Sequence, residues 1–78
     1  MSIEYSLDLK PTGAKPLKVI LEPWGDEHIL QPGSVIKLSF NAPLLTTIPI
    51  THENEVVIIE GTEEVVPTGI WLDGQLIG

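Results

Sequence analysis

Apolar and polar residues alternate along much of this chain of 78 residues, and the alternation predicts where its β-strands lie. Residues 2–9 alternate throughout, and the apolar positions are Ile3, Tyr5, Leu7 and Leu9. A period of two is typical of a strand with one buried face. Residues 17–22 repeat the pattern, but Ile20 interrupts the polar side, so we expect this second strand to be covered on both faces.

Two further strands are predicted in the middle of the chain. Residues 34–40 alternate again and follow a turn at Pro32-Gly33, where the glycine can adopt a positive φ. Residues 41–43 are expected to break this strand. Residues 44–50 predict a weaker one, because Pro49 cannot donate a backbone hydrogen bond and is confined to sheet edges or bulges.

The last third of the chain predicts a buried strand and a hairpin. Residues 56–59 are all β-branched, which favours a strand buried on both faces, with residues 52–55 as the loop before it. Residues 67–69 predict a turn. Asp73-Gly74 joins two short, largely apolar segments, residues 70–72 and 75–77, and such a two-residue link is typical of a β-hairpin.

The elements together predict an all-β fold. About six to eight short strands, spaced roughly eight to twelve residues apart with almost no helical periodicity, indicate a small antiparallel sandwich or barrel. The length corresponds to one domain over residues 1–78, which would bury only about 60–65% of the surface of the unfolded chain. A deep, enclosed active site is difficult to build in that volume.

The centre of the chain resembles a signature of very short, uncharacterised bacterial all-β proteins. In that signature an E-P-W-G turn precedes L-x-P-G and a strand, and the chain closes on a D-G-x-L hairpin. The matching residues here are Glu22-Pro23-Trp24-Gly25, Leu30-Gln31-Pro32-Gly33 and Asp73-Gly74-Gln75-Leu76. More loosely, the chain is similar to the start of a cupin-type jelly roll, which implies a jelly-roll fold. The cupin metal ligands are not matched, because Ile29 and Leu30 follow His28 where the cupin motif needs a second histidine.

Charge limits the possible partners. The chain carries 4 basic residues, all lysine, against 11 acidic ones, which gives a net charge of −7. Because the electrostatic term that dominates nucleic-acid affinity would be repulsive, we expect no nucleic-acid partner. All four lysines lie in the first half. The second half is therefore predicted to present a negative face to a basic partner or a weakly held cation, or simply to solvent.

Composition also bears on compartment and assembly. The chain has no cysteine, no basic-then-apolar leader pattern and no apolar run near the roughly 20 residues that span a bilayer, so we expect a cytoplasmic protein with no membrane contact. The hydrophobic fraction of 42% is high for so short a chain. This predicts a homo-oligomer in which a second copy covers apolar surface, with residues 2–9 as the candidate edge strand for pairing.

The polar loop at residues 22–28 is the candidate binding surface, and its chemistry is carried by Trp24, Asp26, Glu27 and His28. Trp24 is either an exposed platform for a sugar or another planar ligand, or a ring that packs back over the open end of a small β domain. For Trp71, between Ile70 and Leu72, we expect packing.

Metal binding and catalysis are less well supported. His28 and His52, with nearby carboxylates, could ligate one metal ion if their two loops converged; otherwise both are surface histidines. No serine has the G-x-S-x-G context of a nucleophile, and Asp26 and Glu27 would point to opposite faces of an extended segment. We assign no catalytic residue, no metal and no cofactor.

The sequence therefore predicts a non-catalytic, self-associating acidic β domain that acts as an interaction or ligand-binding module for a protein or a small molecule. The alternative is a small cupin-like, metal-dependent enzyme that uses His28, His52 and neighbouring carboxylates.

Overall fold

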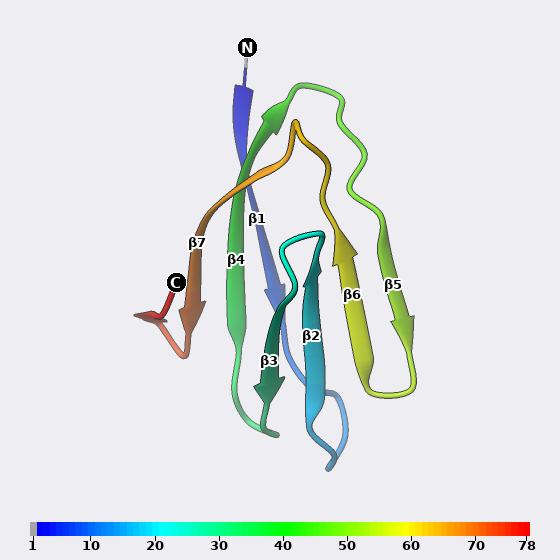
Figure 1. Ribbon diagram of the computed structural model, residues 1–78. Coiled ribbons are helices and arrows are strands. Elements are labelled where there is room, and N and C mark those ends of the chain that lie inside the picture. The colour runs from blue at the N-terminus through cyan, green and yellow to red at the C-terminus, as the bar shows by residue number, and fades with distance from the viewer. Residues whose placement is uncertain (1) are drawn as a thin grey trace.

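The computed structural model describes residues 2–78, which form eight β-strands and no helix (Figure 1). The strands are β1 (Ser2–Leu9), β2 (Leu17–Glu22), β3 (Asp26–Leu30), β4 (Ile36–Pro43), β5 (Ile50–Glu53), β6 (Val56–Glu60), β7 (Val66–Leu72) and β8 (Gln75–Leu76). This part of the chain accordingly contains no helix long and apolar enough to cross a membrane.

The strands form two sheets of four strands each. One sheet has the order β1-β4-β7-β8 and the other has the order β3-β2-β6-β5. Neighbouring strands are antiparallel, except that β2 and β6 run parallel. The β4–β5 and β6–β7 connections cross between the sheets at the same end of the molecule (Figure 1). The predicted small all-β sandwich is confirmed, and the sheets do not close into a barrel.

Apolar side chains from both sheets fill the space between them. Val19 on β2 and Ile59 on β6 are completely buried from one side, and Ile36 on β4 is completely buried from the other. Burying one such side chain contributes about 1.5–3 kcal/mol. The rest of the core consists of Leu17, Leu21, Leu30, Leu38, Phe40, Ala42, Val57, Val65 and Ile70.

The alternating segments fold as predicted, but β2 and β6, which were expected to be covered on both faces, have one buried face each. β1 and β2 have the predicted bounds. Ile20 on β2, and Val56 and Ile58 on β6, are only half-buried, so the expectation of strands covered on both faces is wrong. In a sandwich of two sheets each sheet has a single inner face, and the outer face stays in contact with solvent.

Two segments predicted as loops are strands. The predicted loop at residues 22–28 is reduced to a tight turn, because β3 begins at Asp26 and pairs with β2. Residues 52–55 were likewise predicted to be a loop, yet β5 includes His52 and Glu53, and only Asn54 and Glu55 form the turn to β6.

The opposite error occurs in the weak strand predicted at residues 44–50, because residues 44–49 form a connection and only Ile50 belongs to a strand, β5. This segment must cross from one sheet to the other, so it leaves both hydrogen-bond ladders (Figure 1). Leu45 has a left-handed backbone with φ 65°. The segment rejoins the second sheet where the Pro49 carbonyl accepts a hydrogen bond from the Glu60 N–H at 3.0 Å.

Two predicted strand breaks are also wrong. Residues 41–43 continue β4, because β1 pairs with β4 along its whole length as far as Pro43. Residues 67–69 lie within β7 and not in a turn, since a register shift between Ser39 and Phe40 accommodates them as a bulge. The predicted Asp73-Gly74 hairpin is confirmed, with φ of 49° and 84° at its two central residues.

Candidate interaction surfaces

The structure divides the four predicted binding residues between two sides of the β2–β3 hairpin. Asp26 and His28 are opposite the buried residues of β2, and therefore lie on the inner side of β3. Glu27 is on the outer side, where its Oε1 is 3.3 Å from Nζ of Lys18. The adjacent carboxylates at 26 and 27 thus point to opposite faces, as expected for neighbours on an extended segment.

His28 is a partly buried strand residue and not the predicted surface loop residue. It pairs with Val19 on β2, and its Nε2 atom is buried with no hydrogen-bond partner among residues 2–78. A buried polar atom without a partner costs about 1–3 kcal/mol. The edge position of β3 keeps the rest of the side chain partly accessible.

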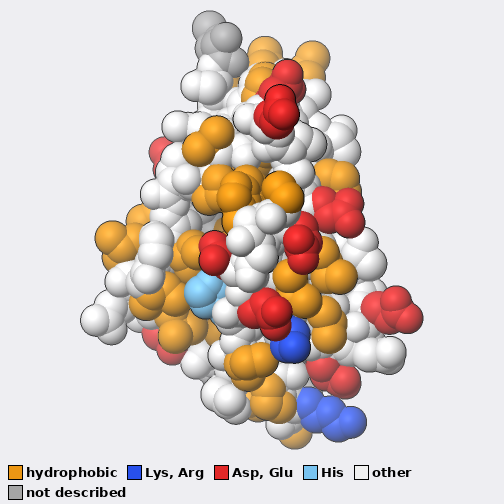
Figure 2. All heavy atoms as spheres, viewed as in Figure 1, with side chains coloured by type: hydrophobic (Ala, Val, Ile, Leu, Met, Phe, Trp, Pro, Cys, Tyr) orange, Lys and Arg blue, Asp and Glu red, His pale blue; other side chains and the backbone are white. Residues whose placement is uncertain are grey.

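Trp24 both packs on the protein and exposes part of its ring. The ring lies across Gly61, at the end of β6, where a Cβ atom would overlap the ring. The Gly61 N–H donates a hydrogen bond of 2.7 Å to the Glu22 carbonyl, which holds the two segments together. Trp24 remains 39% exposed. Figure 2 shows hydrophobic atoms over this region with acidic side chains on both sides of them.

Trp71 has the same arrangement on the outer face of the other sheet. Its ring lies across Gly69, and Nζ of Lys37 is 5.5 Å from the ring centroid. Asp8, Lys37 and Trp71 are register partners across β1, β4 and β7. Together with Val35 and Gly74 they line a shallow hollow of about 320 Å³. The predicted packing role of Trp71 is confirmed by its contact with Gly69.

The two histidines do not come together. His28 lies on β3 and His52 on β5, which are the opposite edges of one sheet. Three strand spacings, or about 14 Å, separate their backbones, and Val19 and Val57 occupy the register positions between them. No group of three or more His, Asp or Glu side chains within residues 2–78 is arranged to hold a metal ion. The convergence on which the metal-dependent alternative depends is therefore not found.

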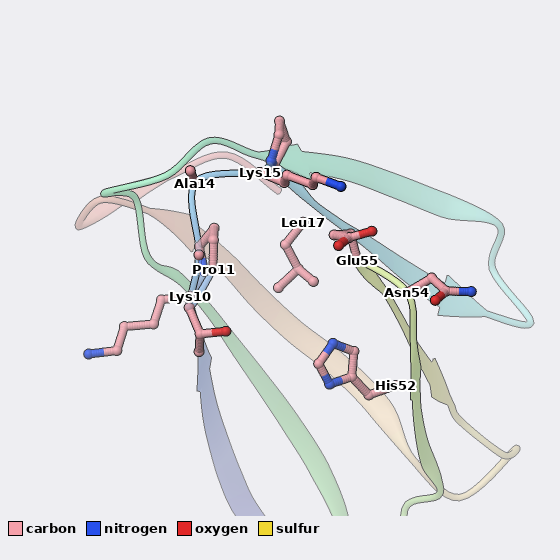
Figure 3. Close-up of a pocket in the computed structure, with 11 residues that line it drawn as sticks. Lys10, Pro11, Ala14, Lys15, Leu17, His52, Asn54 and Glu55 are labelled. Carbon is pink, nitrogen blue, oxygen red and sulfur yellow. The ribbon is translucent and has the colours of Figure 1, made fainter.

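A larger hollow was not predicted from the sequence, although His52, one of the candidate metal ligands, lines it. It has a volume of about 540 Å³ and lies between the β1–β2 connection and the β5–β6 turn (Figure 3). Leu17 lies at its centre, and the His52 ring faces Leu17 from β5. The remaining lining residues are Lys10, Pro11, Thr12, Gly13, Ala14, Lys15, Pro16, Asn54 and Glu55. The two walls are about forty positions apart in the chain, so no local pattern could have predicted this hollow.

β1 is an edge strand of the first sheet, as predicted. Its outward side chains are exposed, and its apolar side chains are only half-buried. Tyr5, Leu7 and Leu9 pack at the margin of the core. The Tyr5 hydroxyl donates a hydrogen bond of 3.3 Å to the Pro43 carbonyl. β1 therefore presents an incompletely covered apolar row beside a row of free backbone groups.

Comparison with known proteins finds no family model that matches the chain, and neither a curated protein nor a solved structure matches it. The resemblance of the E-P-W-G and L-x-P-G motifs to short bacterial proteins, and the looser one to cupins, stay predictions.

Proposed function

We propose that this chain is a non-catalytic, self-associating β module in which the free edge of β1 pairs with the same strand of a second copy. The observation that carries this proposal is that an eight-residue edge strand holds a half-buried apolar row. An uncovered edge is a template for pairing with another chain. A second β1 would satisfy the free backbone groups and cover the apolar row at the same time.

The other three edges are poorer candidates. β8 has two residues and β5 has four, all of them exposed. β3 has five residues, and two of them, Asp26 and Glu27, are charged, which is a larger share of charged residues than in β1. β1 is the longest edge, and it contains neither lysine nor proline, which are residues that commonly protect an edge.

The charges on β1 favour one antiparallel register. With the two-fold axis at Tyr5, each Ile3 is opposite Leu7 of the second copy and each Glu4 is opposite Ser6. No carboxylate then faces another. With the axis shifted to Ser6, Glu4 would be opposite Asp8, and like charges directly opposite are destabilising. The axis at Tyr5 also gives a self-complementary contact, which closes as a dimer.

Light scattering after size exclusion tests this proposal. We expect a mass near twice the 8.5 kDa of one chain at micromolar concentration. Ser6→Glu, on the exposed row, places two carboxylates opposite each other twice per dimer and should weaken the dimer about tenfold. Ser6→Lys is the matched control, because it places an ammonium opposite Glu4 and should preserve the dimer. A wild-type mass of one chain throughout the micromolar range would contradict the proposal.

The β2–β3 turn is the proposed contact surface for a second, basic partner. The Trp24 ring lies over Gly61 and is 39% exposed, Glu60 directly precedes Gly61 in the chain, and Glu22 is the register partner of Glu60. An exposed aromatic ring in an acidic part of the chain suits a lysine-rich or arginine-rich segment. An oligolysine peptide should quench Trp24 fluorescence in a Trp71→Phe background, and an oligoglutamate peptide should not. Equal responses to both peptides would remove this surface from the proposal.

A further inference from the structure

We propose that the hollow between the β1–β2 connection and the β5–β6 turn binds a small amphipathic monoanion, namely a carboxylate with an apolar body. This site is separate from the β1 edge and from the proposed contact surface at the β2–β3 turn. Its volume of about 540 Å³ is within the usual range of about 300–1,000 Å³ for small-molecule sites.

The interior of the hollow is apolar and its rim is polar. Leu17 is 7% exposed and forms the floor, while Pro11, Ala14 and Pro16 supply apolar surface from the connection. His52 and Asn54 contribute groups that can donate hydrogen bonds from the opposite wall (Figure 3). An apolar lining with a few polar groups is typical of sites that orient an amphipathic ligand.

Hydrogen bonds and turn geometry hold the two walls in place. The Glu55 carbonyl accepts a hydrogen bond of 2.8 Å from the Lys18 N–H, which ties the β5–β6 turn to the start of β2. Asn54 and Glu55 have φ of 48° and 34°, as a tight two-residue hairpin turn requires. Pro11 and Pro16 restrict the backbone of the other wall. The hollow is therefore preformed, which reduces the entropic cost of binding.

The distribution of charge selects an anion. Two of the four lysines already have a partner, since Lys18 pairs with Glu27 and Lys37 lies over the Trp71 ring. The other two, Lys10 and Lys15, both line the hollow. In a chain of net charge −7, both lysines that are not in these two pairs therefore lie at this hollow.

The same residues set the charge of the ligand. Two lysines and one carboxylate, that of Glu55, give these side chains a net formal charge of +1. A single negative charge balances this rim, whereas a phosphate dianion would leave excess charge beside Glu55. Lys15 extends along the rim on the side of Glu55, and the Lys10 ammonium points outward (Figure 3). The flexible four-carbon stem of Lys10 allows its ammonium to reach a bound carboxylate.

Backbone amide NMR with three eight-carbon probes tests the proposal. We expect octanoate to produce saturable shifts that concentrate at residues 10–17 and 52–55. Octylammonium and octanol, which share its apolar body, should bind at least about tenfold more weakly, the difference expected for a charge-assisted hydrogen bond. Equal binding of the three probes, or octanoate shifts centred elsewhere or absent, would overturn the proposal.

Two double variants with the same net charge test whether binding depends on the lysines at the rim or on the net charge of the whole protein. Lys10→Gln with Lys15→Gln removes both uncommitted lysines from the rim and should weaken octanoate binding about tenfold. Lys18→Gln with Lys37→Gln is the matched control and should leave the affinity within about twofold. Glu55→Gln should tighten binding, since it removes the opposing carboxylate. Equal losses in both doubles, or weaker binding by Glu55→Gln, would overturn the inference. The mass of each variant is also measured by light scattering after size exclusion. This shows whether a change in octanoate affinity comes from a change in dimerisation.

Discussion

Trp24 lies so close over Gly61 that only a residue without a side chain fits beneath the ring. Trp71 and Gly69 repeat this relationship on the outer face of the other sheet. In both cases the tryptophan ring covers the backbone of a glycine, which has no side chain of its own to shield it. A small domain has few side chains available for this purpose, and the two tryptophans supply large apolar surfaces.

The first prediction follows from this contact. Gly61→Ala should lower the free energy of unfolding by about 1–3 kcal/mol, because the added methyl group displaces the Trp24 ring. Gly13→Ala is the matched control, since nothing lies within 4 Å of the added methyl group there. In a Trp24→Ala background the cost of Gly61→Ala should largely disappear. Urea unfolding of the four variants measures this coupling, and additive effects would contradict the contact.

The second prediction compares two exposed glycines. Gly33 has a left-handed backbone with φ 91°, whereas Gly13 does not have a positive φ. A β-branched residue is strained in the left-handed region, so Gly33→Val should cost about 1–3 kcal/mol more than Gly13→Val. Thermal melts of both variants check this result. Equal melting temperatures would show that the Pro32-Gly33 turn relaxes without cost.

The third prediction concerns the two histidines, which the sequence did not distinguish. His28→Leu removes the unpartnered Nε2 atom while keeping apolar volume, and should stabilise the fold by about 1 kcal/mol. His52 is exposed, so His52→Leu should change stability by no more than about 0.5 kcal/mol. Chemical denaturation of both variants provides the measurement. Marked destabilisation by His28→Leu would mean that the imidazole has a binding partner in solution.

The fourth prediction concerns the β5–β6 turn. Glu55 adopts φ 34°, a conformation that asparagine and glycine tolerate better than glutamate does. Glu55→Gly creates the Asn-Gly pair that this type of turn prefers, and should raise the free energy of unfolding by about 1 kcal/mol. Glu53→Gly, just before the turn, should destabilise the protein. A lower melting temperature for Glu55→Gly would show that its side chain stabilises the fold.

Local signals explain which parts of the fold could be predicted. The alternation in β1 and β2 and the Asp-Gly link in the last hairpin each lie within a few consecutive residues, and these elements were predicted with correct positions. β3 was missed because Asp26, Glu27 and His28 are polar, and an edge strand can keep polar residues that an interior strand could not.

Tertiary contacts explain the remaining errors. Pro67 can lie within β7 because a bulge opposite Ser39 and Phe40 leaves Thr68 without a partner, and nothing near Pro67 in the sequence indicates that bulge. The large hollow was also missed, because it depends on the Lys18 N–H meeting the Glu55 carbonyl. Of the predicted binding residues, Trp24 was correctly placed at a turn, while His28 required knowledge of strand pairing.

The sheet orders also divide the protein into two interlocking halves. Strands β1 to β4 supply one adjacent pair to each sheet, and β5 to β8 supply the other pair. The halves join along β4 with β7 and along β2 with β6, so during translation neither sheet can be completed until the carboxyl-terminal strands have left the ribosome. If the chain were cut within residues 44–49, one peptide would carry β2 and β4 and the other would carry their partners β6 and β7. We expect the two peptides to reassemble without a covalent link.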